Sequence, residues 1–335
     1  MHMSRAVGIV GVGAAVPDRV LTNAHLESTL ETSDEWITTR TGIKERRIAD
    51  SHTATSDLAA LAARRALHGA GLSPDQVDLI IVGTVTPDMA FPSTACLVQQ
   101  ALGATRAAAF DLEAACTGFI YGLAIGQQFV ASGVYDTVLV IGAETLSRIT
   151  DYQDRSTAIL FGDGAGAAVL RPVADGYGIL SSILGADGSG ADLLRLPAGG
   201  SRLPASEETV RDRLHYLQMA GNEVFKFAVR IMDEAAEQAL AKCGLTPNQI
   251  DLLVPHQANQ RIIDSAVRRL GIPMEKVVVN LDRYGNMSSA SVPVGLDEAV
   301  KQGRIRDGDL VVLVGFGGGL TWGATVIRWG GTVVD

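Results

Sequence analysis

The chain has 335 residues, 47% of them hydrophobic and 19% charged, which is enough for two domains of ordinary size. The formal net charge is −9, the pI is about 5.2 and no basic run exceeds two residues, which argues against a nucleic-acid-binding protein. Three cysteines without metal-ligand spacing argue against both a disulfide framework and a cysteine-ligated metal.

Residues 6–16 form the first apolar run. Glycines interrupt it and Pro17 ends it, so it is too short to span a bilayer, and it lacks a signal-peptide cleavage pattern. Gly11 and Gly13 resemble the start of a dinucleotide fingerprint, but Val16 at its sixth position argues against a nucleotide site. We therefore expect a soluble, cytoplasmic protein without a membrane segment.

An alanine-rich segment at residues 55–70 is predicted to be a helix. It ends at Gly71, as helices often end at a glycine. A Leu-Ser-Pro turn follows, and then the nearly continuous aliphatic run 77–82. Such a run predicts a strand buried on both faces, and hence a largely parallel sheet between helices.

Cys116 lies between an apolar run and a segment rich in Ala, Gly and Leu that is predicted to be a helix. A thiol at this junction lies at a helix N-terminus, where unpaired N–H groups and the helix dipole favour the thiolate. Cys116 is therefore the candidate nucleophile. Cysteine is more often a small buried hydrophobic residue, and this is our interpretation of Cys96, inside a predicted helix, and of Cys243, at a helix end.

The second part of the chain repeats the first at a constant offset of 173 residues. Residues 71–82 and 244–255 are identical at six of twelve positions, and the same offset places residues 138–142 on 311–315. In the preceding helical segments it also aligns Ala62, Ala63, Ala66 and Leu67 with Ala235, Ala236, Ala239 and Leu240. We infer a duplication.

The duplication predicts two similar halves, residues 1–172 and 173–335. The first carries the candidate cysteine, and the boundary lies near residues 171–175, where Arg-Pro-Val-Ala-Asp breaks the pattern. Alternating strands and helices indicate α/β layers. Two such halves are expected to pack together with the site between them.

His256 directly follows the strand predicted at residues 250–254, and a polar cluster in that place is typical of sites in α/β sheets. Asn286 lies three residues before Ser289, which by the offset corresponds to Cys116. Taken alone, His256 is a weak signal and Asn286 is a turn or helix-capping residue. The other five histidines are expected at the surface.

Residues 315–323 read Gly-Phe-Gly-Gly-Gly-Leu-Thr-Trp-Gly after a predicted buried strand. Consecutive glycines let backbone N–H groups approach a ligand with no Cβ in the way, as an oxyanion hole requires. A tight hairpin between two strands is the alternative, and both can hold together.

Together, the motifs resemble those of the β-ketoacyl-acyl-carrier-protein synthase III family from end to end. They are residues 32–43 (TSDEWITTRTGI), 114–118 (AACTG), 161–166 (FGDGAG), 254–259 (VPHQAN), 285–286 (GN) and 316–319 (FGGG). The resemblance implies an α/β thiolase-like fold, a duplicated five-layered αβαβα arrangement, which agrees with the duplication inferred from the offset.

The resemblance also implies a triad of Cys116, His256 and Asn286, with the backbone N–H groups of Cys116 and Gly318 forming the oxyanion hole. The asparagine distinguishes this chain from elongating ketoacyl synthases, which use two histidines. It likewise distinguishes the chain from biosynthetic thiolases, with a second cysteine, and from hydroxymethylglutaryl-CoA synthases, with a glutamate. Plant-type polyketide synthases share Cys-His-Asn, but they are longer and end in a Gly-Phe-Gly-Pro-Gly loop.

The activity implied by the resemblance is a decarboxylative Claisen condensation that initiates fatty acid synthesis. Cys116 is expected to accept an acyl group from a short-chain acyl-CoA, with acetyl-CoA favoured, and to condense it with malonyl-acyl-carrier protein. No metal or redox cofactor is required, and a homodimer is expected. The negative net charge does not exclude these acidic partners, because a local basic patch can bind them.

Binding residues are implied in the same way. Trp36 and Arg155 are expected to sandwich the adenine of coenzyme A. The full coenzyme A set is Trp36, Arg40, Arg155, Phe225 and Asn259. The basic patch for the carrier protein is Lys226, Arg261, Arg268 and Arg269, and a spacing of two helical turns places Arg261 and Arg268 on one face.

Phe91, Leu146 and Phe161 are expected to form the acyl pocket. The segment around Phe91 crosses the dimer interface in this family and closes the partner's pocket, so its bulky ring favours a short primer. The segment 199–213 looks longer than in related proteins and could change the pocket wall.

Three alternatives remain open. A priming synthase of secondary metabolism, or an acyltransferase of the same fold, would keep Cys116 and His256 and use a different acyl-CoA. A Cys-His-Asn hydrolase would release free acid without needing malonyl groups. A non-catalytic binding protein of this fold is disfavoured because all three triad positions are intact.

Overall fold

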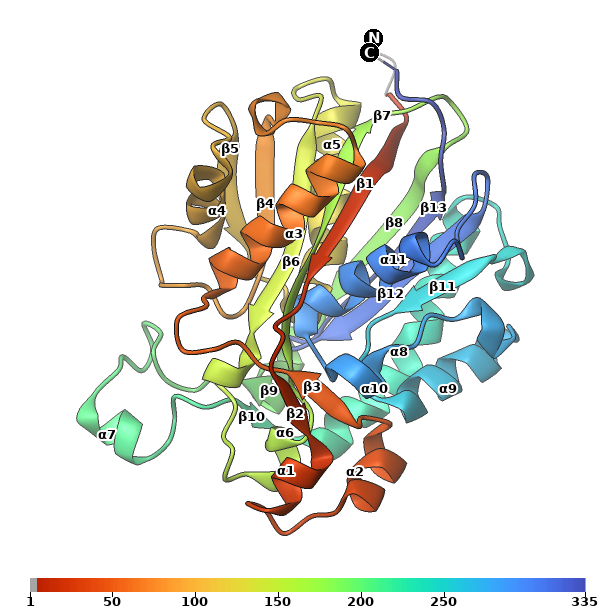
Figure 1. Ribbon diagram of the computed structural model, residues 1–335. Helices are drawn as coiled ribbons and strands as arrows, with labels where there is room; N and C mark the ends of the chain where they lie inside the picture. Colours follow the sequence, from red (N-terminus) through yellow and green to blue (C-terminus); the bar gives the residue numbers. More distant parts are fainter. Residues whose placement is uncertain (1–4, 335) are drawn as a thin grey trace.

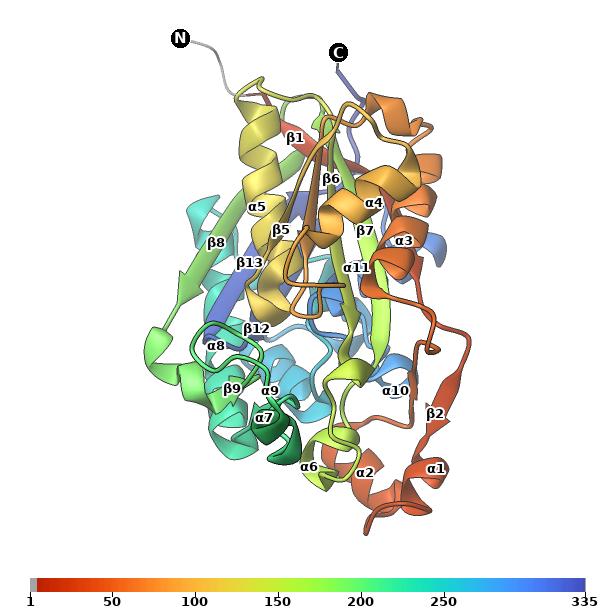
Figure 2. The same ribbon diagram turned by 90° about the vertical axis from the view of Figure 1, so that its left-hand side faces the viewer.

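Two β-sheets alternate with three layers of helices, giving five layers (Figure 1; Figure 2). The structure is a computed structural model, and it describes residues 5–334. Within these residues, no helix is long and apolar enough to cross a bilayer.

Each sheet is built from one part of the chain. The first has the order β1 (Val7–Ala15), β7 (Asp163–Pro172), β6 (Val138–Thr145), β4 (Leu79–Gly83), β5 (Ala108–Leu112). The second has the order β8 (Gly178–Ala186), β13 (Thr321–Arg328), β12 (Leu310–Gly317), β11 (Leu252–Pro255). Strand β4 is parallel to β5 and β6, and β11 is parallel to β12, as the continuous aliphatic runs predict.

Helices cover both faces of each sheet. The middle layer, packed between the two sheets, is α5 (Gly118–Ala131) and α11 (Ser291–Lys301). The outer face of the first sheet packs against α3 (Thr55–Gly69) and α4 (Thr94–Leu102). The outer face of the second packs against α8 (Gly221–Lys242) and α9 (Gln260–Leu270).

Short elements gather at one end of the layers, low in Figure 1. They are β2 (Val20–Thr22), α1 (Asn23–Glu27), α2 (Asp34–Thr41), β3 (Glu45–Arg47), α6 (Arg155–Ala158), β9 (Leu194–Arg195), α7 (Glu207–Arg211), β10 (Gln218–Met219) and α10 (Leu281–Tyr284). Of these, α7 projects from the body on the loop between β9 and β10 (Figure 1).

The offset of 173 residues holds in three dimensions. It relates β4 to β11, and it relates the 3₁₀ turn η2 (Ala115–Thr117) to η7 (Ser288–Ala290). Even the backbone strain is repeated, because Ala115 and Ser288 have φ angles of 46° and 47°. In the second sheet, the counterpart of β5 is reduced to a single parallel bridge between Leu253 and Val277. The predicted boundary falls between the end of β7 and the start of β8.

Cys96 is exposed, so the interpretation of this residue as a buried hydrophobic side chain is wrong. It lies in α4 as predicted, but Ala95, Val98 and Leu102 form the buried face of that helix. Cys96 lies outside this face, where its sulfur accepts a hydrogen bond from the Ser93 hydroxyl at 3.2 Å. Cys243 is half-buried.

Candidate active site

A strained turn places Cys116 at the start of α5. Ala115, just before it, has a positive φ, which is uncommon for a residue other than glycine. The Glu113 carboxylate accepts the Ala115 N–H at 2.9 Å and stabilises this turn. The N–H groups in the first turn of a helix have no partners within the helix, so they are available to a group held at Cys116.

The Cys116 thiol is buried, at 7% exposure. Burial raises the pKa of this thiol to about 12, against the opposing effect of the neighbouring Ser288 hydroxyl. The helix N-terminus favours the thiolate, as the sequence predicts, but burial works against it. Burial therefore favours the protonated form of the Cys116 thiol.

His256 follows β11 and is 1% exposed. Its backbone N–H donates to Val314 at 2.8 Å, and its ring meets the Phe316 ring edge-on with centroids 5.4 Å apart. Burial lowers the pKa of His256 to about 3, so the imidazole is neutral at physiological pH. Its Nδ1 has no hydrogen-bond partner among the described residues. A neutral imidazole has one N–H to donate.

Asn286 is held by its backbone just before η7. Its N–H donates to Leu160 at 2.8 Å, and its carbonyl accepts from the Gly162 N–H at 3.0 Å. The side-chain Oδ1 accepts from the Ser288 N–H at 2.8 Å. This bond identifies the acceptor end of the amide and leaves Nδ2 as the group that can donate to a ligand.

Two glycines of β12 show where the segments from the two halves meet. A Cβ on Gly315 would lie 3.6 Å from the His256 Cβ and 3.7 Å from the Cys116 carbonyl oxygen. A Cβ on Gly317 would lie 2.6 Å from the Cys116 nitrogen, so only glycine fits there. Because η2 also packs against η7, the segments carrying Cys116, His256 and Asn286 converge.

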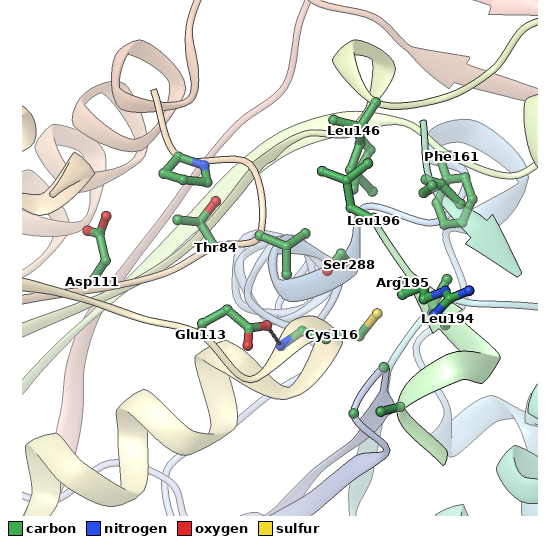
Figure 3. Close-up of a pocket in the computed structure, with 18 of the residues that line it drawn as sticks. Thr84, Asp111, Glu113, Cys116, Leu146, Phe161, Leu194, Arg195, Leu196 and Ser288 are labelled. Carbon is green, nitrogen blue, oxygen red and sulfur yellow. Dashed lines mark hydrogen bonds between the residues drawn. The ribbon is translucent and has the colours of Figure 1, made fainter. Parts of the chain in front are cut away.

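A cavity of about 580 Å³ opens beside Cys116 (Figure 3). Leu146 and Phe161, both predicted for the acyl pocket, line it together with Cys116. Gly318, predicted for the oxyanion hole, lines it as well. His256 and Asn286 are not among its lining residues.

Two features predicted for the pocket lie outside this cavity. Phe91 is 84% exposed, and its neighbour Ala90 lines the cavity instead. The segment 199–213 contributes none of the lining residues, although Leu196 and Leu217 on either side of it do.

The residues predicted to sandwich adenine already touch each other. The guanidinium carbon of Arg155 lies 4.8 Å from the centroid of the Trp36 ring, and that of Arg40 lies 5.9 Å from it. Arg155 also donates to the Glu31 carbonyl at 2.9 Å. Since adenine between two groups needs about 7 Å, two contacts of about 3.5 Å each, Arg155 has to move to admit it.

Asn259, predicted to bind coenzyme A, has a structural role. Its Oδ1 caps α9 by accepting the Arg261 N–H at 2.9 Å, and its Nδ2 donates to the Arg40 carbonyl at 3.1 Å. The Arg261 guanidinium carbon lies 5.0 Å from the centroid of the Phe225 ring. The Arg40–Asn259 bond thus joins the residues around Trp36 to those around Phe225. None of the residues predicted for coenzyme A lines the 580 Å³ cavity.

The predicted basic patch lies along α8 and α9. Arg261 and Arg268 line the same groove of about 340 Å³, as their spacing predicts. Lys226 is exposed on α8. Arg269 lies 3.5 Å from the carboxylate of Asp233, so part of its charge is already used within the chain.

Sequence reasoning did not identify Glu144 or Ser288. Glu144 lies in β6, fully buried, and burial raises its pKa to about 7. Ser288 lines the cavity beside Cys116 (Figure 3), and its buried Oγ has no hydrogen-bond partner among the described residues. Two signals were present: a carboxylate two residues after the repeated aliphatic segment 138–142, and the offset of 173 that pairs Ser288 with Ala115.

Comparison with known proteins agrees with this geometry. A family model described as 3-oxoacyl-[acyl-carrier-protein (ACP)] synthase III matches residues 110–188, and the model of its C-terminal part matches residues 240–329. A relative from Symbiobacterium thermophilum, named β-ketoacyl-[acyl-carrier-protein] synthase III, is 66% identical over 326 residues. The match covers 97% of this chain and 99% of the relative.

Solved structures show the same architecture. The β-ketoacyl-[acyl-carrier-protein] synthase III of Thermus thermophilus is 54% identical with a TM-score of 0.91, and the match covers 97% of this chain and 100% of that one. A priming β-ketosynthase from a polyketide biosynthetic pathway is 38% identical with a TM-score of 0.91, covering 99% and 98% of the two chains. The predicted thiolase-like, five-layered fold is thus confirmed.

Proposed function

Because the chain belongs to the β-ketoacyl-[acyl-carrier-protein] synthase III family, we propose that it condenses an acyl-CoA with malonyl-acyl-carrier protein. The primer is a short-chain acyl-CoA, with acetyl-CoA favoured, and the product initiates fatty acid synthesis. The supporting observation is that the segments carrying Cys116, His256 and Asn286 converge from both halves, and that Cys116 lines a cavity there.

The first half-reaction transfers the acyl group to Cys116. The sulfur attacks the thioester carbon, the bond to coenzyme A breaks, and the proton of the thiol ends on the departing coenzyme A sulfur. The backbone N–H groups of Cys116 and Gly318 stabilise the oxyanion that forms in between. Both residues line the cavity, which supports this assignment.

The second half-reaction forms the carbon–carbon bond. Malonyl-carrier protein loses CO₂, and His256 and Asn286 donate hydrogen bonds to its thioester oxygen as the enolate develops. Burial lowers the pKa of His256 to about 3, so the ring acts as a neutral donor. The carbanion attacks the acyl group on Cys116 and gives the β-ketoacyl-carrier protein. These steps need neither a metal nor a redox cofactor.

For substrate binding, we assign coenzyme A to the surface around Trp36 and Arg155, once Arg155 has moved off the ring. The carrier protein is assigned to the basic patch defined above. Lys226, Arg261 and Arg268 contribute exposed charge there, whereas Arg269 is partly neutralised by Asp233.

We propose a cytoplasmic homodimer. Strand β5 is an edge strand with half-buried Phe110 and Leu112, and Phe91 and Met89 expose apolar surface on the preceding loop. An unpaired apolar edge of this kind is suited to pairing with a second copy. In such a dimer, Phe91 would enter the partner's cavity rather than its own.

A condensation assay tests the proposed function. Acyl-CoAs of increasing length are combined with malonyl-carrier protein, and the carrier-bound product is weighed by mass spectrometry. We expect a β-ketoacyl product with wild-type protein and short primers, and none with Cys116→Ala. Free acid released without malonyl-carrier protein would show a hydrolase instead.

A second candidate is a priming synthase of secondary metabolism with a different acyl-CoA. It is supported by the 38% identity with a polyketide priming β-ketosynthase across almost the whole chain. The same panel separates the two, because such an enzyme would prefer a primer other than acetyl-CoA.

A further inference from the structure

Glu144 is buried among hydrogen-bond donors, and burial raises its pKa to about 7. Its carboxyl group accepts from the Val85 N–H at 3.1 Å and from the Thr86 hydroxyl at 2.6 Å. The Ser289 hydroxyl lies 2.7 Å from the Gly83 carbonyl and 3.0 Å from Glu144 Oε1. The Ser289 hydroxyl has one proton for these two acceptors, so a proton on Glu144 would allow both contacts to be full hydrogen bonds.

Ser288 lines the cavity beside Cys116, and its neighbour Ser289 contacts Glu144. The Ser288 hydroxyl lowers the pKa of both Cys116 and Glu144. Its Oγ nevertheless has no hydrogen-bond partner among residues 5–334. A buried hydroxyl without a hydrogen-bond partner destabilises the folded protein. A role in proton transfer would account for the Ser288 hydroxyl at this place.

A second cavity is lined by a residue that contacts Glu144. It measures about 440 Å³, and Thr55, Thr86 and Thr145 line it together with His52. Thr86 thus borders this cavity, and its hydroxyl donates a hydrogen bond to Glu144. Thr145 lines the same cavity, but its hydroxyl bonds to Thr55 at 2.8 Å.

The proposed reaction needs a proton at this place. In the condensation, the malonyl group loses CO₂, its electron pair forms the new carbon–carbon bond, and the bond to Cys116 breaks with its electrons left on sulfur. The sulfur must gain one proton before the next cycle, so each turnover consumes one proton from solvent. Burial makes the Cys116 thiolate strongly basic, which sets the direction of this transfer.

We propose that Glu144 supplies this proton to Cys116 through Ser288 and regains one from the second cavity through Thr86. The proton moves from Glu144 to Ser288 Oγ while the Ser288 proton moves to sulfur. The Glu144 carboxylate then takes the Thr86 proton, and water in the second cavity replaces it. This inference rests on the proposed function. Because Glu144 acts on Cys116 only through Ser288, we describe it as a positioning residue in the proton transfer and not as a catalytic residue.

Other titratable groups lie on the segments around Glu144, and none forms an ion pair with it among the described residues. Asp88 accepts from Ser56, Asp163 accepts from Ser147, and Arg148 donates to the Thr53 carbonyl. These groups are His52, Asp88, Asp111, Glu113, Cys116, Arg148, Asp163 and His256.

Glu144→Gln tests the acid. The amide can donate to Ser289 and accept from Thr86 as the protonated acid does, but it cannot give up a proton. Acetylated enzyme is mixed with malonyl-carrier protein at pH 5.5 to 9, and condensation is compared with acetylation at each pH. Since burial raises the pKa of Glu144 to about 7, wild-type condensation should fall as pH rises through about 7. The variant should lose that pH dependence, and its ratio of condensation to acetylation should fall by about 10²-fold, a typical contribution of general acid catalysis.

Thr86→Val tests whether Glu144 regains its proton through Thr86, and Thr145→Val is the matched control. Thr86→Val removes the hydroxyl that links Glu144 to the second cavity, so the first turnover should match wild type and later turnovers should be slower. Thr145→Val removes a hydroxyl of the same cavity that does not contact Glu144, and all its turnovers should match wild type. Thermal unfolding of each variant checks that it is folded.

The inference is wrong if Glu144→Gln keeps the wild-type pH profile and rate ratio, or if the two threonine variants behave alike. Failure of the proposed function is a separate outcome, because wild-type protein would then form no β-ketoacyl product at any pH.

Discussion

Burial sets the chemistry of the individual groups at the site. It keeps His256 neutral, keeps the proton on Cys116, and raises the pKa of Glu144 to about 7. All three groups are fully enclosed, and a low-dielectric environment disfavours the charged form of each. Catalysis by this site therefore depends on hydrogen bonds from neutral donors more than on fixed charges.

His256→Ala and Asn286→Ala should each slow decarboxylation of malonyl-carrier protein by about 10²–10³-fold, because each removes one donor to the developing enolate. Both variants should still accept an acetyl group on Cys116. Release of CO₂ and acetylation are measured separately, with His68→Ala as control because His68 is exposed on α3. Normal decarboxylation in both variants would contradict the roles given to these residues.

Glu144→Gln should also change how stability depends on pH. The folded carboxyl keeps its proton up to about pH 7, whereas the unfolded one loses it near 4.5. Its contribution to stability is complete below pH 4.5 and is lost as pH rises through 7. A glutamine at this position does not titrate. Between pH 4.5 and 8, the free energy of unfolding of the wild type should therefore fall by up to about 3 kcal/mol relative to that of the variant. Urea unfolding measures it, and a constant difference across this range would mean that Glu144 is not a buried acid.

The residues recognised from sequence were those in motifs. Cys116 follows an apolar run, His256 follows a predicted strand, and Asn286 was located by the offset. The structure brings these three segments together. Glu144 and Ser288 were missed, because their importance arises from contacts between the two halves that no local pattern records. Cys96 was misjudged because an isolated apolar residue in a short helix does not reveal which face packs on the sheet.

At the scale of elements, the internal repeat was the strongest signal. The offset of 173 residues by itself predicts that β4 corresponds to β11 and that η2 corresponds to η7, and both correspondences hold. It did not predict the positive φ at Ala115 and Ser288, since neither residue favours that conformation in isolation. The tight packing of the two halves imposes it.

Gly142 of β6 marks how closely these elements approach. A Cβ there would lie 2.2 Å from the Ser289 carbonyl oxygen, so Gly142→Ala should displace η7. We expect a loss of about 1–3 kcal/mol in the free energy of unfolding, as in overpacked cores, together with slower condensation. Gly188→Ala is the control, because no heavy atom lies within 4 Å of its Cβ position. If the two variants changed the free energy of unfolding in urea equally, the close approach of Gly142 to Ser289 would not constrain the fold.

At the scale of the whole molecule, the five layers explain where the site lies. The middle-layer helices α5 and α11 begin at the turns η2 and η7, so duplication brings two equivalent helix starts together between the sheets. One start carries Cys116, the proposed nucleophile, and the other carries serines with Asn286 just before them. One chain leaves β5 and the loop with Phe91 uncovered, which is the basis of the proposed dimer.

Phe91→Thr tests whether this ring limits the primer. If Phe91 enters the partner's cavity, its removal should open volume and let Cys116 accept longer acyl groups, while the protein remains dimeric. The chain-length profile of Cys116 acylation is compared by mass spectrometry with that of Met89→Thr, which alters an exposed side chain of the same loop. An unchanged profile for Phe91→Thr would mean that the ring serves only the interface.

The most direct test of the central claim follows one acyl group through one turnover. Purified protein is incubated with acetyl-CoA, freed of excess substrate, and then mixed with malonyl-carrier protein while the peptides and the carrier are weighed by mass spectrometry. We predict one acetyl mass on the Cys116 peptide, which disappears as an equal amount of acetoacetyl-carrier protein forms. Label on Cys96 or Cys243, or loss of the acetyl group as free acetate without malonyl-carrier protein, would contradict condensation through an acyl-Cys116 intermediate.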